Sequence, residues 1–200
     1  ARALDDTLDG EPSPLPAVNP APSLAVSDDG QRLRVYVDDA TAGTDAITPR
    51  IVAQLQDPVS GEWGALVPIT DGSHWVADPV VAWAGSGASR IAVAAWTERP
   101  TTLAEDLAID DDIGALLARQ EIYLATFQNG AWSAPVRLTN DLLPDGSASI
   151  AGDATGYTLA WVFDQDGNAA TRLDVRLKLR EVTLGGAATT SVLASDAMNV

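Results

Sequence analysis

The sequence predicts an all-β protein made of tandem four-stranded antiparallel β-sheets, three blades of a β-propeller, with a short helical insertion. Two observations predict this fold. Short apolar or alternating segments recur along the chain, separated by turns that contain Asn-Gly, Asp-Gly or Gly-Gly. Segments that contain tryptophan also recur, in a consistent order, which is the pattern of a repeat architecture.

The clearest repeat begins at Gly61. Residues 61–71, GEWGALVPITD, align with residues 130–140, GAWSAPVRLTN, 69 positions further along the chain. After each copy come a polar stretch, a short apolar strand and a strand that ends in tryptophan, at Trp96 and at Trp161. The same succession of strands is therefore expected after both copies.

Residues 24–38 provide a third copy of this pattern. They overlay residues 150–164 without a gap, at an offset of 126. Two successive repeats of about 60 residues each account for that offset. The repeats predict a propeller-like domain over residues 23–200, divided into units at about 23–72, 73–141 and 142–200.

Each unit is expected to contain four strands, because apolar or alternating runs lie between turn signals. The expected strands are 23–26, 33–37, 51–56 and 65–69 in the first unit, 80–83, 91–96, 121–127 and 135–138 in the second, and 149–152, 158–163, 174–182 and 190–193 in the third. Residues 1–22 are interpreted as an acidic, proline-rich leader or linker, since dense prolines fix φ and remove backbone donors.

Residues 100–119 interrupt the second unit and are not strand-like. Thr102 and Glu105 have the spacing of a capping box, which predicts a helix start. Leu103, Leu107 and Ala108 would share one face of that helix. Two interpretations remain open for this apolar face: it packs onto its own blade, or it is a contact arm for a partner.

The segments 132–139, WSAPVRLT, and 78–82, DPVVA, resemble the blade repeats of bacterial secreted and surface β-propeller proteins. This resemblance implies an architecture and not an activity, because the S-x-D-x-G-x-T-W turn of sialidase-type propellers is not reproduced. Known propellers close with about four to eight blades, so three blades leave two uncovered sheet faces. Closure by a partner, a longer parent polypeptide and an open stack are the alternatives.

Composition excludes several function classes. The net charge is −16, from 28 acidic and 12 basic residues, which opposes binding to nucleic acid and to anionic membrane surfaces. The absence of cysteine excludes disulfides and thiolate sites, and a single histidine excludes multi-histidine metal sites. No apolar run approaches the roughly 20 residues of a membrane-spanning helix, so no membrane insertion is expected.

Two tryptophans are candidate ligand-binding residues. Trp63, Trp132, Trp96 and Trp161 occupy matched repeat positions and are expected in the core between sheets. Trp75 and Trp83 break the pattern, so they are the candidates for a surface that stacks on a ligand such as a sugar.

A calcium site is the one cofactor hypothesis. Asp164, Asp166 and Asn168 place three oxygen ligands in a glycine-containing turn, as hard cations require. An ordinary hairpin turn is the alternative, because no further carboxylate follows before Asp174.

No residue is singled out as catalytic. His74 is interpreted as a polar loop residue, since a neighbouring serine does not make a triad. The expected function is a non-catalytic structural or binding module of an exported bacterial protein, at the cell surface or outside the cell. Its expected partner is a second copy of the chain, another protein, or the remainder of a longer polypeptide. The alternatives are part of a propeller hydrolase acting on carbohydrate, or a subunit of a filament or surface assembly.

Overall fold

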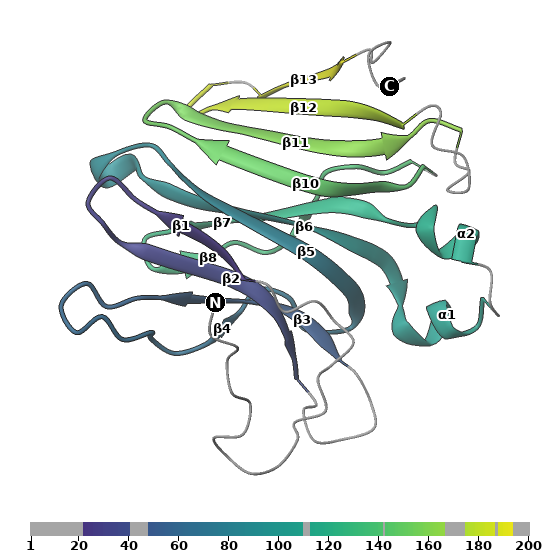
Figure 1. Ribbon diagram of the computed structural model, residues 1–200, viewed down its shortest axis with the longest axis horizontal. Helices are drawn as coiled ribbons and strands as arrows, with labels where there is room; N and C mark the ends of the chain where they lie inside the picture. The colour runs from purple at the N-terminus through teal and green to yellow at the C-terminus, as the bar shows by residue number, and fades with distance from the viewer. Residues whose placement is uncertain are drawn as a thin grey trace, which may run out of the picture.

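The computed structural model describes residues 22–40, 48–109, 113–141, 143–166, 175–186 and 188–193. Over these ranges the chain is mostly β, and its strands form three antiparallel sheets that follow one another along the sequence (Figure 1). The predicted all-β class is confirmed, as are the repeated antiparallel sheets.

Sheet 1 contains β1 (Ser23–Val26), β2 (Arg32–Asp39), β3 (Pro49–Leu55) and β4 (Val67–Pro68), in that order. Buried residues alternate with half-exposed or exposed ones along β2, as expected for a strand with one face in a core. Gly30, with φ of +85°, permits the tight turn between β1 and β2.

Sheet 2 contains β5 (His74–Ala84), β6 (Ile91–Thr102), β7 (Glu121–Gln128) and β8 (Ala131–Trp132), and β9 (Val136–Arg137) also pairs with β7. A 3₁₀ turn, η1 (Gly87–Ser89), connects β5 to β6. The middle of β6 is buried on both sides, because sheet 2 is the middle layer of the three.

The helical insertion leaves sheet 2 between β6 and β7 as α1 (Leu103–Leu107) and α2 (Ile113–Leu117). The predicted capping box between Thr102 and Glu105 is present. The expected apolar face is only partly buried: Leu103 is half-buried, whereas Leu107 is 85% exposed. The buried residue of α1 is Asp106, whose carboxylate lies 2.6 Å from Nε of Arg99 on β6, so an ion pair holds α1 to sheet 2.

Sheet 3 contains β10 (Asp145–Gly152), β11 (Gly156–Asp164), β12 (Val175–Thr183) and β13 (Ala188–Leu193). Figure 1 shows the three sheets as successive layers, with sheet 2 between the other two. Neither described helix, at five residues, has the length to cross a membrane.

The first strand of each later sheet lies across the sheet before it. Strand β5 contacts β1, β2 and β3, and β10 contacts β5, β6 and β7. One buried cluster joins sheets 1 and 2, and a second joins sheets 2 and 3. The described residues form an open stack with no closed ring, so the assignment of the sheets as propeller blades belongs with the proposals below.

Hydrogen bonds confirm that residues 61–71 and 130–140 are equivalent. The backbone N–H of Ile51 donates to Oγ1 of Thr70 at 2.8 Å, and that of Ile122 donates to Oγ1 of Thr139 at 2.9 Å. Each threonine therefore accepts a hydrogen bond from the equivalent backbone N–H near the start of the third strand of its sheet.

A pair of β-bulges also repeats at the 69-residue spacing. Asp78 and Ser147 have φ of 50° and 51°, and the pairing shifts register at both places. The bulge lets β5 continue pairing on both sides of Asp78, so the strand begins at His74 and not at the expected residue 80.

The gapless overlay of residues 24–38 on 150–164 is wrong by one residue in its second strand. Leu24 pairs with Arg34, whereas Ile150 pairs with Leu159. The β1–β2 connection is one residue longer than the β10–β11 connection, because Val26 pairs with Arg32 and Gly152 with Tyr157. Tyr36, and not Val35, is therefore the equivalent of Trp161.

The corrected register gives each sheet a front face and a back face. The front face is the side that carries Tyr36 in sheet 1, Trp96 in sheet 2 and Trp161 in sheet 3; the back face is the other side. Trp96 packs against sheet 1, and Trp161 packs against sheet 2. In both interfaces, the front face of the later sheet packs on the back face of the earlier one.

Candidate functional site

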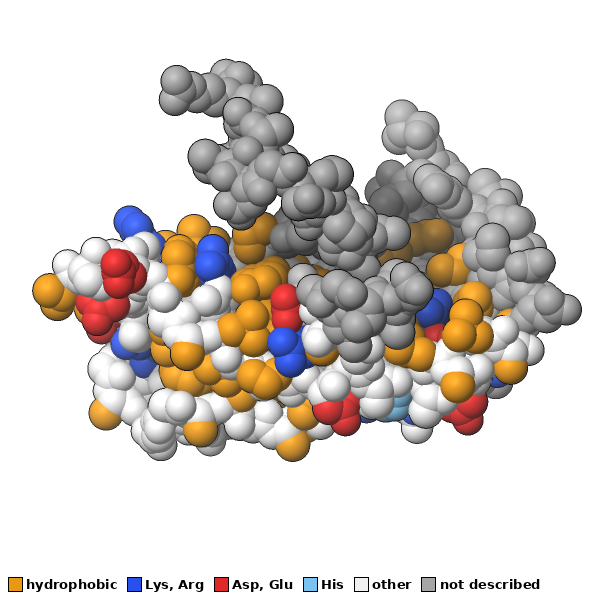
Figure 2. Space-filling model, turned by 90° about the horizontal axis from the view of Figure 1, so that it is seen from below, with side chains coloured by type: hydrophobic (Ala, Val, Ile, Leu, Met, Phe, Trp, Pro, Cys, Tyr) orange, Lys and Arg blue, Asp and Glu red, His pale blue; other side chains and the backbone are white. Residues whose placement is uncertain are grey.

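The front face of sheet 1 carries apolar side chains that belong to neither buried cluster. Leu24 and Val26 of β1 are each 56% exposed. Their structural equivalents are Val81 and Trp83 in sheet 2, which pack against sheet 1. Viewed from below in the orientation of Figure 1, the side on which sheet 1 lies, hydrophobic side chains gather with basic ones among them (Figure 2).

Arginines lie on the same front face as these apolar side chains. Arg34 lies with its guanidinium 4.3 Å from the ring centroid of Trp63, and its Nη2 donates to Oε1 of Gln54 at 2.7 Å. Arg50 forms an ion pair with Asp38 at 2.7 Å. By the strand register, three arginines and one aspartate lie on this front face: Arg32, Arg34, Arg50 and Asp38.

The back face of sheet 3 is the second apolar surface outside the two buried clusters. Ala160, Val162, Leu177 and Leu179 are half-buried there. The equivalents of Leu177 in the other sheets are Ile51 and Ile122, which are both fully buried. The basic residues of β12 lie on the opposite, front face: Arg176, Lys178 and Arg180.

Trp83, a predicted ligand-binding residue, lines a pocket of about 380 Å³ between sheets 1 and 2. Its ring meets Phe127 edge to face, with centroids 6.4 Å apart. The guanidinium of Arg90 lies 4.9 Å from the Trp83 ring centroid. Arg90 occupies a face of the indole, so a sugar ring that stacked on that face would have to displace it.

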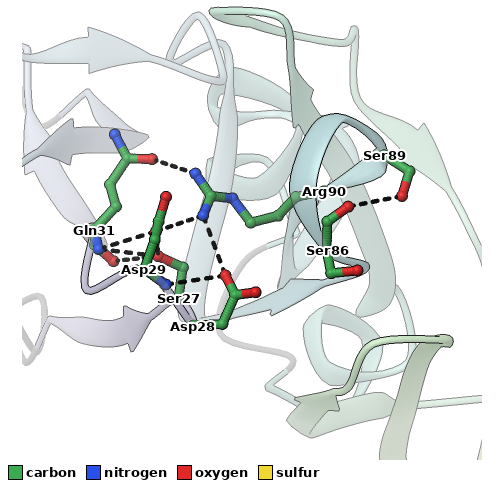
Figure 3. Close-up of polar contacts among 7 residues, drawn as sticks. All are labelled: Ser27, Asp28, Asp29, Gln31, Ser86, Ser89 and Arg90. Atoms are coloured by element: carbon green, nitrogen blue, oxygen red, sulfur yellow. Dashed lines mark hydrogen bonds and ion pairs between the residues drawn. The ribbon is translucent and has the colours of Figure 1, made fainter.

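Arg90 is held by the β1–β2 turn of sheet 1 (Figure 3). Its Nη1 lies 2.5 Å from Oδ1 of Asp29 and 3.3 Å from Oδ1 of Asp28, and its Nη2 donates to Oε1 of Gln31 at 3.1 Å. The hydrogen bond from Ser27, followed by that from Arg90, lowers the pKa of Asp29 to about 2. This cluster ties the turn of sheet 1 to sheet 2.

Trp75, the other predicted ligand-binding residue, lies elsewhere on β5. It is half-buried, and the guanidinium of Arg99 lies 4.3 Å from its ring centroid. Trp75 and Trp83 are eight residues apart on one strand, a separation of about 25 Å. The structure does not bring them into one site, and ligand binding at either remains a prediction.

The predicted calcium ligands are only partly described. Asp164 is the last residue of β11 and is buried, while Asp166 is exposed. Asn168 lies outside the described residues. The calcium hypothesis therefore remains a prediction.

The structure also assembles an acidic cluster that the sequence analysis missed. One carboxylate oxygen from each of Glu121, Asp141 and Asp145 lies within 4.8 Å of the others. Glu121 and Asp145 are fully buried. Nη2 of Arg137 lies 2.6 Å from Glu121, and Nζ of Lys178 lies 3.3 Å from Asp141 and 3.5 Å from Asp145.

Two basic side chains therefore already neutralise most of the charge of this cluster, which makes it an ion network between sheets 2 and 3. Burial raises the pKa of Asp145 to about 6, and the Asp141 charge adds to that rise, while Lys178 and the hydrogen bonds from Thr139 and Trp161 oppose it. One signal in the sequence could have found the network: Asp145 aligns with Val76, so a charge replaces an apolar residue at a repeat position.

Comparisons with known proteins found no matching family model and no matching curated protein.

Proposed function

We propose that this chain is a non-catalytic structural or binding module of an exported bacterial protein, and that further sheets or a partner chain close its stack. The sheets are then blades of a propeller completed in the assembly. One observation carries the proposal: the two end faces keep apolar residues at positions that pack into the interfaces between sheets elsewhere in the chain. Leu24 is 56% exposed, whereas its equivalent Val81 is 6% exposed.

The charged residues support a module without chemistry of its own. Glu98 accepts a hydrogen bond from Trp96 at 2.7 Å and contacts Nδ1 of His74 at 2.7 Å. Glu121 and Asp145 belong to the ion network between sheets 2 and 3. Each of these buried carboxylates therefore has a basic or hydrogen-bonding partner within its own sheet. The net charge of −16 suits a soluble, acidic surface outside the cell.

Binding of an apolar fluorescent dye tests the proposal, at a dilution where light scattering shows single chains. The folded chain should bind the dye, and replacing Leu24 and Val26 together with serine should reduce that binding. Val59→Ser is the matched control, because Val59 is 94% exposed in the β3–β4 connection, away from the end faces. If the folded single chain binds as much dye after the double replacement as before it, the proposal is wrong.

Two other functions would show themselves by carbohydrate turnover or by the mass of the assembly. Turnover of carbohydrate by the completed assembly would favour a propeller hydrolase. A mass that grows without limit would favour a filament or surface-assembly subunit, in which end faces join chain after chain.

A further inference from the structure

The two interfaces inside the chain follow one packing rule. In each, the first strand of the later sheet lies across the back face of the earlier sheet, β5 on sheet 1 and β10 on sheet 2. Val81 and Ile150 occupy the same position in those two strands, and both pack into the interface. Leu24 occupies that position in β1 and is left exposed.

The back face of sheet 3 is the surface that this rule would pair with β1. At its centre, Ala160 and Leu179 are cross-strand partners, as are Val162 and Leu177. The equivalents of Ala160 in the other two sheets are Val35 and Ala95, both 0% exposed. The chain therefore leaves Leu24 and Val26 of β1 exposed on the front face at one end, while Val52 of β3 on the same face is buried. At the other end it leaves a half-buried apolar back face.

Charge also favours pairing of these two faces. The free front face of sheet 1 carries Arg32, Arg34 and Arg50 against Asp38. On the back face of sheet 3, the register places the exposed Glu181, and all basic residues of β12 lie on the other side. A chain of net charge −16 would otherwise repel its own copy, so a basic face opposite an acidic one selects this mode of contact.

We infer that the occupant of both faces is a second copy of this chain, with sheet 1 of each copy packed on sheet 3 of the other. This inference rests on the proposed function and names its partner. Two identical front-to-back contacts related by a two-fold axis form a closed ring of six sheets, within the four to eight of known propellers. The new contacts continue the packing rule already used twice within each chain.

Light scattering on the full chain, with two complementary variants, tests this pairing. The wild type should have a mass of about twice 20.8 kDa. Val26→Asp disables the front face of sheet 1, and Leu179→Asp disables the back face of sheet 3, so each variant should remain at the mass of one chain. A mixture of the two should recover a mass of two chains, because each variant keeps the face that the other needs.

Controls separate folding from pairing. Each variant must retain the β-type circular dichroism of the wild type. If Leu179→Asp fails to fold, Glu181→Arg replaces it, because Glu181 is exposed and its reversal removes the charge match. Val59→Asp should keep the wild-type mass, since Val59 lies outside both faces.

The outcomes distinguish this inference from the proposed function. In one outcome, the wild type stays a single chain at 100 times the concentration used in the dye experiment and still binds apolar dye through Leu24 and Val26. That result would show that the partner is not a second copy, but it would still support the proposed binding module. A single chain without such dye binding overturns both. A pair that survives in either single variant, or a mass that keeps rising beyond two chains, overturns the closed front-to-back ring.

Discussion

Trp161 donates its indole N–H to a carboxylate oxygen of Asp145 at 2.8 Å, within the buried interface between sheets 2 and 3. Trp96, at the same position in sheet 2, donates to Glu98 at 2.7 Å. The two acceptors occupy opposite members of one cross-strand pair, Val76 with Glu98 in sheet 2 and Asp145 with Phe163 in sheet 3. In each sheet, one member of this pair is the acidic acceptor of the indole and the other is apolar. The first strand supplies the acid in sheet 3, and the second strand supplies it in sheet 2.

The raised pKa of Asp145 predicts a specific pH dependence of stability. Its pKa is about 6 in the fold against an ordinary 3.8, so the folded state binds the proton more tightly than the unfolded state. The contribution of this group is most favourable below about pH 4 and is lost as the pH rises through 6, a change of about 3 kcal/mol. Asp145→Asn should remove this dependence and still accept the indole hydrogen bond.

Chemical denaturation of the wild type and Asp145→Asn between pH 4 and 7.5 measures this difference. The free energy of unfolding of the wild type should fall relative to that of the variant as the pH rises. Parallel curves would show that Asp145 titrates normally in the fold.

The matched tryptophans should differ in their contribution to stability. Trp161 is 2% exposed and its indole N–H is bonded, so Trp161→Ala should cost about 3–5 kcal/mol. Trp132 is half-buried at the edge of the cluster between sheets 1 and 2, with its ring 5.4 Å from that of Phe127. Trp132→Ala should therefore cost less. Equal losses in urea denaturation would contradict this ranking.

The two equivalent threonine hydrogen bonds should contribute similar amounts to the free energy of unfolding. Thr139→Val and Thr70→Val each remove the acceptor for a backbone N–H, that of Ile122 or of Ile51, and should cost about 1–3 kcal/mol. Faster hydrogen exchange at those two amides would accompany the loss. A variant as stable as the wild type, with unchanged exchange, would show that the bond is dispensable.

Gly152 should not tolerate a side chain. A Cβ there would overlap the main-chain carbonyl of Trp83, because β10 crosses β5 closely at this point. Gly152→Ala should separate sheets 2 and 3 locally and lower the melting temperature strongly. Gly30→Ala is the control: it has open space but a φ of +85°, and should cost about 1 kcal/mol. A smaller loss for Gly152→Ala than for the control would rule out this close approach.

The pKa of Asp29 should respond more to Ser27 than to Arg90. The Ser27 hydrogen bond is the largest cause of its lowering to about 2, and Arg90 follows. Carboxyl NMR titration should show a larger rise toward 3.8 in Ser27→Ala than in Arg90→Met. The reverse order would mean that the ion pair, and not the turn, sets the charge of this carboxylate.

Local patterns in the sequence determined much of this fold. The turn residues and the alternation along residues 33–37 predicted strands that the structure contains, and Thr102 with Glu105 predicted the start of α1. These features depend on neighbours a few residues apart, so they can be recognised without knowing how sheets pack. The match of residues 61–71 to 130–140 is also confirmed, because Thr70 and Thr139 make equivalent hydrogen bonds.

Tertiary structure decided what no local pattern contains. One extra residue in the β1–β2 connection moved the aromatic position of sheet 1 from Val35 to Tyr36, because side chains alternate faces along a strand. Glu121 and Asp145 are 24 residues apart and meet where two sheets pack. The exposure of Leu24 followed from the order of the stack, since a face is free or covered only according to the sheet that lies against it.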